Sequence, residues 1–166
     1  MKKKNRIKKK VIVICILLFC FCVYNIVWFQ SVYKPYIPFC EAVGKDEDGD
    51  YYYVKDDISY YVNTPDYLRN TGNLAIGTAV IEDGKDVMNM IIWRKLDGTY
   101  KVGISIEEYE VDNDGTVHCE SIKFEIDEQM KLLAANEEKQ KVLEEYRNDI
   151  ERYYDLAEDM WGILGS

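Results

Sequence analysis

The side chains that most resemble a catalytic group are His118, Cys119 and Glu120, which include the single histidine of the chain. A cysteine nucleophile needs a base within hydrogen-bonding distance to accept its proton. Neighbouring side chains of a strand point to opposite faces, so His118 and Cys119 can share a proton only where a bulge turns one of them. His118 and Glu120 share a face, but two ligands are too few for a zinc site. We therefore interpret these residues as surface positions and expect no enzyme activity, metal or cofactor.

A run of acidic residues has the spacing of the first half of a calcium-binding loop, formed by Glu110, Asp112, Asp114 and Gly115. The closing position, which must supply a bidentate carboxylate, is Ser121. We therefore interpret the segment as an acidic β-turn. Two carboxylates could also hydrolyse a glycosidic bond, so a small surface hydrolase stays an alternative, although no spacing selects a pair among the 30 Asp and Glu.

Tyrosine is the most distinctive residue type, with 14 in the chain and five of them between positions 51 and 61. Tyrosine combines contact area with a hydroxyl and is enriched where proteins bind partners, although it also favours strands and cores. We predict two regions of partner contact, a Tyr-rich hairpin and an acidic hairpin tip. Their residues are Tyr51, Tyr52, Tyr53, Tyr60 and Tyr61 in the first, and Glu108, Glu110, Asp112 and Asp114 in the second.

Charge divides the chain into three parts. Seven Lys and Arg lie in residues 1–10, residues 11–29 carry no charge, and residues 30–166 contain 14 Lys and Arg against 30 Asp and Glu, a net charge of −16. Such an acidic domain would repel phosphates, so we expect no binding of nucleic acid. It would attract a cationic protein, so an inhibitor or immunity-type protein that neutralises a basic secreted enzyme is an alternative function.

The uncharged residues 11–29 predict a transmembrane signal anchor. Nineteen residues of helix extend about 28 Å, close to the thickness of a bilayer core. The basic stub of residues 1–10 places the N-terminus in the cytoplasm and the rest of this single-pass protein outside the cell membrane. A cleaved signal peptide is the alternative, but the segment lacks a small-residue cleavage pattern at its end.

The remaining chain divides into a stalk and a domain. We expect residues 30–50 to form a stalk, because Pro35 and Pro38 interrupt helices, and residues 51–166 to form the extracytoplasmic domain. Cys40 and Cys119 would then lie in a compartment where disulfides persist, and they form the one candidate pair. Spacing alone does not decide whether they are bridged.

Three turn signals predict the register of a four-stranded antiparallel sheet over residues 74–126. Asp83-Gly84 and Asp97-Gly98 are typical of two-residue turns, and Asn113-Asp114-Gly115 of a turn with a glycine bulge. Together with a hairpin formed by residues 51–54 and 58–62, they predict a meander whose apolar side chains share one face. The predicted pairs are Val80 with Val87, Ile76 with Ile91, Leu74 with Trp93, Trp93 with Val102, Ile91 with Ile104, Val102 with Ile126, Ile104 with Phe124, and Ile106 with Ile122.

Beyond Ile106 the apolar positions change face, which indicates either a bulge or a hairpin tip that leaves the sheet. A second apolar strip of Met88, Met90 and Ile92 falls on the other face of the predicted sheet. We expect the Tyr-rich hairpin to cover it, and a strip open to a partner is the alternative.

After the sheet, Asp127 is the expected N-cap of a helical pattern that reaches Leu164, with a break at residues 134–138 as an option. The predicted fold class is α+β, with an N-terminal transmembrane helix, an antiparallel meander of about four to six strands, and a C-terminal amphipathic helix packed on one face. As function we expect non-catalytic binding or scaffolding at the cell surface, through a cationic protein or an envelope polymer.

Overall fold

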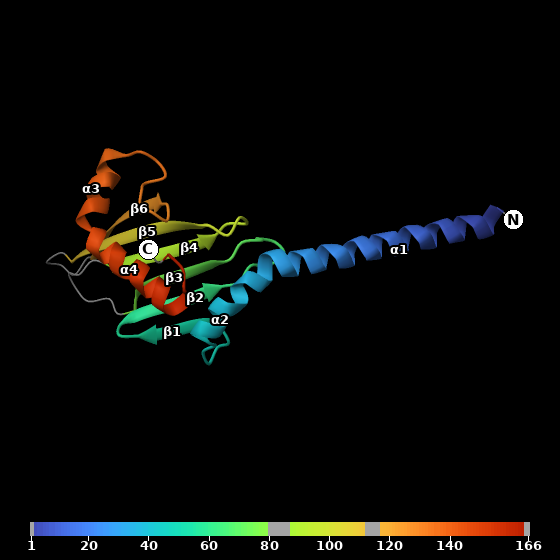
Figure 1. Ribbon diagram of the computed structural model, residues 1–166, viewed down its shortest axis with the longest axis horizontal. Coiled ribbons are helices and arrows are strands. Elements are labelled where there is room, and N and C mark those ends of the chain that lie inside the picture. The colour runs from blue at the N-terminus through green and yellow to red at the C-terminus, as the bar shows by residue number, and fades with distance from the viewer. Residues whose placement is uncertain (1, 80–86, 112–116, 165–166) are drawn as a thin grey trace. The chain divides into compact units, whose positions relative to one another are not determined.

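The computed structural model describes residues 2–79, 87–111 and 117–164, and describes side chains for residues 10–79, 87–107 and 119–164. The chain forms two compact units, Met1–Pro35 and Tyr36–Ser166. Figure 1 shows a long helix in the first unit, and a sheet with helices in the second. The class of the second unit is α+β, as predicted.

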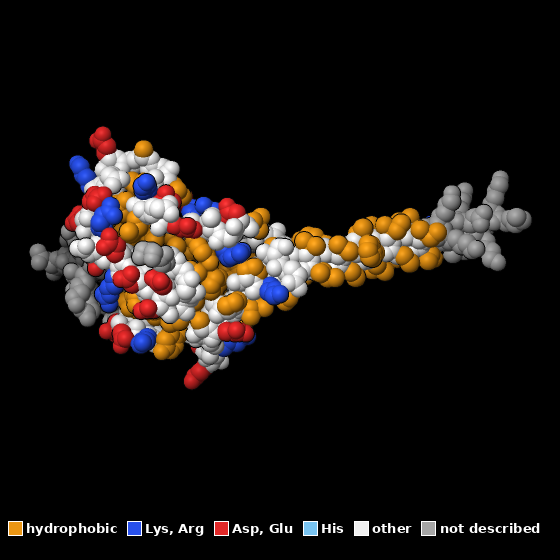
Figure 2. Space-filling model, in the orientation of Figure 1, with side chains coloured by type: hydrophobic (Ala, Val, Ile, Leu, Met, Phe, Trp, Pro, Cys, Tyr) orange, Lys and Arg blue, Asp and Glu red, His pale blue; other side chains and the backbone are white. Residues whose placement is uncertain are grey.

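The first unit consists mainly of α1 (Lys2–Trp28), followed by a π-helical turn, η1 (Phe29–Tyr33). Proline and glycine are absent from residues 1–34, so nothing in the sequence interrupts the helix. Its apolar side chains are exposed, Phe19 by 69% of its surface (Figure 2). Among the described residues, the helical stretch Lys10–Val43 is the one long and apolar enough to cross a membrane, with a mean hydropathy of 2.8 in its most apolar window.

The second unit is built on one antiparallel sheet of six strands in sequential order, which confirms the predicted meander (Figure 1). Each strand pairs with the next along the chain. Short turns connect β1 with β2 and β4 with β5, whereas residues 64–72 form a longer loop between β2 and β3. The strands are β1 (Tyr51–Lys55), β2 (Ile58–Asn63), β3 (Asn73–Thr78), β4 (Val87–Arg94), β5 (Tyr100–Val111) and β6 (Val117–Ile126).

The Tyr-rich hairpin forms as predicted, from β1 and β2. Lys55 pairs with Ile58 across a two-residue turn. Both turn residues, Asp56 and Asp57, have positive φ angles, 51° and 61°. Aspartate tolerates this left-handed conformation better than most residues, and two such residues form the turn whose twist matches that of the strands.

Strand β4 is shifted by one residue relative to the prediction, so four predicted pairs are wrong and the other face of β4 joins the core. Because side chains alternate, a shift of one residue exchanges the two faces of a strand. The pair Val80 with Val87 lies outside the described residues. Toward β3, Ile76 pairs with Met90 in place of Ile91, and Leu74 pairs with Ile92 in place of Trp93. Toward β5, Val102 pairs with Ile92 in place of Trp93, and Ile104 pairs with Met90 in place of Ile91.

The turn between β4 and β5 explains the shift on that side. A two-residue turn at Asp97-Gly98 would pair Leu96 with Thr99. Instead, the Gly98 N–H donates to the Lys95 carbonyl (3.1 Å) and the Lys95 N–H donates to the Thr99 carbonyl (2.7 Å). Gly98 has φ 90°, so the loop is a three-residue turn with glycine in the left-handed bulge position.

The hairpin of β5 and β6 has the predicted register, with Val102 opposite Ile126 and Ile104 opposite Phe124. Pairing continues without a bulge to the last pair of the hairpin, so the bulge interpretation is wrong. The described pairing of β4 with β5 begins at Val87, opposite Glu107, and residues 80–86 lie outside the described part. The second interpretation, a hairpin tip that leaves the sheet, therefore stays a prediction.

One face of the sheet carries the hydrophobic core. Alternate side chains of the strands, including Leu74, Ile76 and Ile92, share this core with α2 (Ile37–Val43), α3 (Glu137–Glu145) and α4 (Arg147–Trp161). Figure 1 shows α4 lying across the strands. Burial of apolar surface at about 25 cal/mol per Å² is the main stabilising term of such an arrangement.

Two tyrosine hydroxyls connect α4 to the sheet. The Tyr153 hydroxyl donates to the Met88 carbonyl (3.1 Å) and lies 3.3 Å from the Thr78 hydroxyl. The Tyr154 hydroxyl donates to the Asp127 carbonyl after β6 (3.0 Å). Because these bonds are buried or partly buried, each fixes the position of the helix as well as satisfying a polar group.

Residues 30–50, expected to form a stalk, are helical over much of their length. Pro38 lies in the first turn of α2, where its missing N–H removes no hydrogen bond. Phe39, Cys40 and Val43 of this helix are buried in the core. The domain therefore includes a segment that the prolines made us assign to the stalk.

Asp127 does not cap a helix. Its carboxylate accepts the N–H groups of Gln129 (2.9 Å) and Lys131 (3.0 Å), which forms a local turn. The first helix after the sheet begins ten residues later at Glu137, where the Asn136 side chain accepts the Lys139 N–H (2.9 Å).

Tyr154 generates a testable dependence of stability on alkaline pH. Burial raises its pKa above the ordinary value of 10.0. Below that value both states keep the proton, whereas above it the unfolded chain loses a proton that the folded chain retains, so stability falls as pH rises. We expect Tyr154→Phe to lose less stability between about pH 9 and pH 11 than the native chain. Urea unfolding of the full chain in detergent, followed by circular dichroism, measures this, and equal losses would contradict it.

Candidate binding surface

Among the described residues, the helices pack against the core, and the opposite face of the sheet meets a helix only at Lys139 of α3. We call this opposite face the open face. Its side chains alternate along each strand with those of the core. They are Tyr52 and Val54 of β1, Ser59 and Tyr61 of β2, Ala75 and Gly77 of β3, Asn89, Ile91 and Trp93 of β4, Lys101, Gly103 and Ser105 of β5, and Lys123 and Glu125 of β6.

The pairing places these side chains in rows that cross the strands. One row is largely apolar and leads from Tyr52 through Tyr61, Ala75 and Ile91 to Gly103. With strands about 4.8 Å apart, its five positions extend over about 19 Å. The neighbouring row is polar and contains Ser59, Asn89, Ser105 and Lys123. The open face therefore presents an apolar band beside a band of hydroxyl, amide and ammonium groups.

A groove of about 800 Å³ lies on this face. Its floor is formed by strands from β3 to β6, and one wall is formed by residues 132–134. That wall is held in place because the Leu133 N–H donates to the Glu125 carbonyl (2.9 Å), beyond the edge of β6. A concave, mostly apolar groove with a few polar groups is the usual form of a ligand site.

Small residues shape the floor of the groove. A Cβ atom at Gly103 would lie 2.8 Å from the Trp93 ring, so the absence of a side chain there allows the indole to lie against the backbone of β5. The Lys101 ammonium lies 4.9 Å from the centre of that ring and 2.7 Å from a Glu125 carboxylate oxygen. This cation–π contact and ion pair orient the indole at the rim of the groove.

Two polar side chains belong to the lining of the groove, Ser105 and Asn89. The Ser105 hydroxyl is buried and has no partner among the described residues, which costs about 1–3 kcal/mol. Because its oxygen is closed to solvent, a ligand in the groove does not reach it without a change of structure. Asn89 packs its amide oxygen against Gly77, where a Cβ atom would collide with it.

The groove is electrically balanced although the domain is strongly acidic. It is lined by two carboxylates, Glu107 and Glu125, and two ammonium groups, Lys123 and Lys139. Its charge therefore favours neither an anion nor a cation, and a ligand without net charge suits it best.

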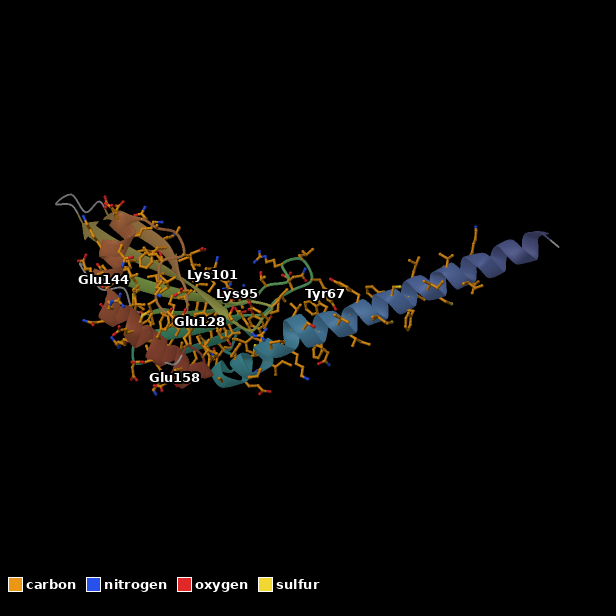
Figure 3. All side chains as sticks on the ribbon, turned by 45° about the horizontal axis from the view of Figure 1, so that its top comes forward. Tyr67, Lys95, Lys101, Glu128, Glu144 and Glu158 are labelled. Carbon is orange, nitrogen blue, oxygen red and sulfur yellow. The ribbon has the colours of Figure 1, made fainter. Side chains whose placement is uncertain are left out.

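A second groove, of about 1070 Å³, differs sharply in charge. It lies where the turn before β5, residues 128–130 and α4 meet, and no Lys or Arg lines it within the described part of the chain. Tyr100, Met130 and Tyr154 add apolar surface. Figure 2 shows Asp and Glu side chains spread over the face that carries α4. The acidic side chains of this groove are Asp97, Glu128, Glu151, Asp155 and Glu158, two of which are labelled in Figure 3.

The predicted Tyr-rich contact region is only partly accessible. Tyr52, Tyr53 and Tyr61 are exposed, whereas Tyr51 is half-buried. Tyr60 belongs to the core, where its ring meets Trp161 edge-on at 5.9 Å. The hairpin therefore divides its tyrosines between the two faces, and only Tyr52 and Tyr61 reach the open face.

The predicted acidic tip can be located only by its backbone. Glu108 and Glu110 lie on β5 opposite Glu120 and His118, and their side chains fall outside the described part. Asp112 and Asp114 lie outside the described residues altogether.

The two cysteines considered for a disulfide are both free thiols in this structure. Cys40 is buried on α2, where burial raises the pKa of its thiol. Cys119 is exposed on β6, opposite Tyr109. His118 and Cys119 are successive residues of β6, which pairs without a bulge, and the side chain of His118 lies outside the described part.

Sequence reasoning missed Ile91 and Trp93 as surface residues, because the predicted register assigned them to the core. Asn89 could have revealed the error, because it shares a face with Ile91 and Trp93. The predicted register would have buried its amide in the core without a hydrogen-bonding partner. The acidic groove had no local signal, because its carboxylates come from three separate segments.

Comparison of the chain with protein-family models, with curated proteins and with solved structures finds no match. In the part of the chain that the structure describes, no three His, Cys, Asp or Glu side chains are grouped so that they could hold a metal ion. The arguments for a function therefore come from the two grooves and from the exposed apolar helix.

Proposed function

We propose that this chain is a single-pass membrane protein whose extracytoplasmic domain binds a neutral envelope polysaccharide on its open face, without catalysis. The observation that carries the proposal is the charge-balanced groove of about 800 Å³. Tyr61 lies beside it on the same face, next to the lining residue Ala75. The long apolar helix supports the location, and the groove supports the ligand.

The properties of α1 support a membrane anchor. The side chains of residues 11–27 form an exposed apolar surface, which is unfavourable in water and favourable in lipid. In a helix every backbone polar group of the span is satisfied internally. Seven Lys and Arg in the first ten residues favour a cytoplasmic N-terminus, which puts the acidic domain outside.

The layout of the open face supports a polysaccharide as ligand. Sugars present apolar C–H faces that pack on aromatic rings, and hydroxyl rims that hydrogen-bond to polar side chains. Tyr61 and Trp93 offer rings, and Asn89 and Lys123 offer polar groups. A row of about 19 Å is several sugar units long, so a polymer segment matches it better than a single sugar.

Protease treatment of intact cells tests the topology. An epitope appended after Ser166 should be destroyed by protease added outside, because the domain lies beyond the membrane. An epitope before Lys2 should survive until the cells are lysed. Survival of the C-terminal epitope, or recovery of the domain from the medium without residues 1–29, would contradict the proposed anchor.

Binding to the polysaccharide is tested with a pair of matched tyrosine variants. Tyr61 of the open face and Tyr53 of the other face have similar exposures, 37% and 42%, and lie in the same hairpin. We expect Tyr61→Ala to weaken binding of the full chain in detergent to protein-free envelope glycan by about tenfold, as for an aromatic contact residue. Tyr53→Ala should bind like the native chain in the same co-sedimentation measurement.

Equal binding by both variants, or no binding by the native chain, would contradict the assignment of the open face. Circular dichroism of each variant shows whether the fold is retained. Binding should also change little between low and high salt, because the groove has two charges of each sign.

A second candidate function is favoured by the acidic groove. Five carboxylates around an apolar floor suit a basic protein, as in an inhibitor that neutralises a cationic enzyme. In that case a basic partner would bind with a steep loss of affinity as salt rises, and Glu158→Gln would weaken it while Tyr61→Ala would not.

A further inference from the structure

Strand β1 forms one edge of the sheet, and no strand pairs with its outer backbone groups. Because Lys55 and Ile58 close a two-residue turn, they form a hydrogen-bonded pair, and the bonded pairs then alternate along the hairpin. The backbone N–H and C=O groups of Tyr52 and Val54 therefore point away from β2. Among the described residues, only the Tyr52 N–H has a partner outside the hairpin, the Asp50 carbonyl at 3.1 Å.

The two edges of the sheet differ in protection. At β6, Ile126 forms a bridge with Leu132, and the Leu133 N–H donates to the Glu125 carbonyl. Strand β1 has no such cover in the described part, and Tyr52, Tyr53 and Val54 are 39–45% exposed. It contains no proline and pairs without a bulge, so it lacks two of the devices by which proteins usually block an edge. An open edge of this kind can accept a further strand.

The charges around β1 select the kind of strand it would accept. Residues 45–57 contain six Asp and Glu against two Lys, and they lie immediately before and after the strand. The strand itself carries one charge, at Lys55. Two copies of this chain paired through β1 would bring these acidic flanks together, which disfavours self-association. A segment with basic residues at both ends would meet opposite charge on each side.

We propose that the β1 edge binds an extended segment of a partner protein, with Lys or Arg at both ends of a short uncharged run, as a seventh strand of the sheet. Backbone hydrogen bonds to Tyr52 and Val54 supply the pairing, and the acidic flanks supply the preference for a basic segment. This site uses the edge of the sheet and is independent of the ligand proposed for the open face.

A blocked nine-residue peptide, Lys-Lys-Thr-Val-Thr-Val-Thr-Lys-Lys, serves as the probe, and the same peptide with Glu at the Lys positions serves as its control. We expect fluorescence anisotropy to show binding of the Lys peptide to the full chain in detergent and none of the Glu peptide. Val54→Pro removes an outward N–H that β2 does not use, so it should weaken binding about tenfold or more, whereas Val54→Thr, which keeps that N–H, should not. Replacing Asp56 and Asp57 by Asn preserves the turn and should weaken binding about threefold.

Hydrogen exchange of the native chain keeps the test independent of whether Val54→Pro folds. On addition of the Lys peptide, the Val54 amide should become protected while amides of β6 stay unchanged. Protection confined to another part of the sheet, equal binding of both peptides, absence of binding, or formation of a dimer that Val54→Pro abolishes would each overturn the proposal.

Discussion

The structure of the domain depends on one constraint: in an antiparallel meander each strand pairs with the next, and none of the described connections between strands contains a helix that could cover the sheet. The segments before β1 and after β6 supply the described helices, and α2, α3 and α4 all contribute to the same core. Burying one face by this route leaves the other face toward water. There most side chains are small, aromatic or polar, with Val54 and Ile91 among them as aliphatic residues. A larger apolar patch without cover would promote aggregation. The groove on the open face is the direct consequence of helices on one side.

The surfaces that this arrangement creates differ in charge. The acidic residues concentrate around α4 and around β1, whereas the open face keeps two charges of each sign in its groove. A strongly acidic domain with one balanced groove is suited to bind a neutral ligand there without long-range repulsion. The net charge of −16 would at the same time keep a tethered domain soluble and select basic protein partners at the acidic surfaces.

The sequence predicted the strand pairing correctly where the alternation of apolar residues fits only one register. The β5 and β6 pairs follow from alternating apolar residues that fit one register. Strand β4 has apolar residues in both phases, so its face depended on the turn at Gly98, whose extra residue no periodicity reveals. Tyr60 was offered as a contact residue although its alternation with Ile58 and Val62 already placed it in the core. Grooves formed by distant segments require the tertiary structure, because no spacing along the chain records them.

The most direct test of the open face is oxidative footprinting of the tryptophans in the full chain, with and without envelope polysaccharide. Trp93 lies at the groove, whereas Trp161 is buried in the core beside Tyr60 and serves as the internal reference. Our account predicts that the polysaccharide protects Trp93 from oxidation and leaves Trp161 unchanged. Unaltered oxidation of Trp93 at a polysaccharide concentration that saturates binding would contradict it.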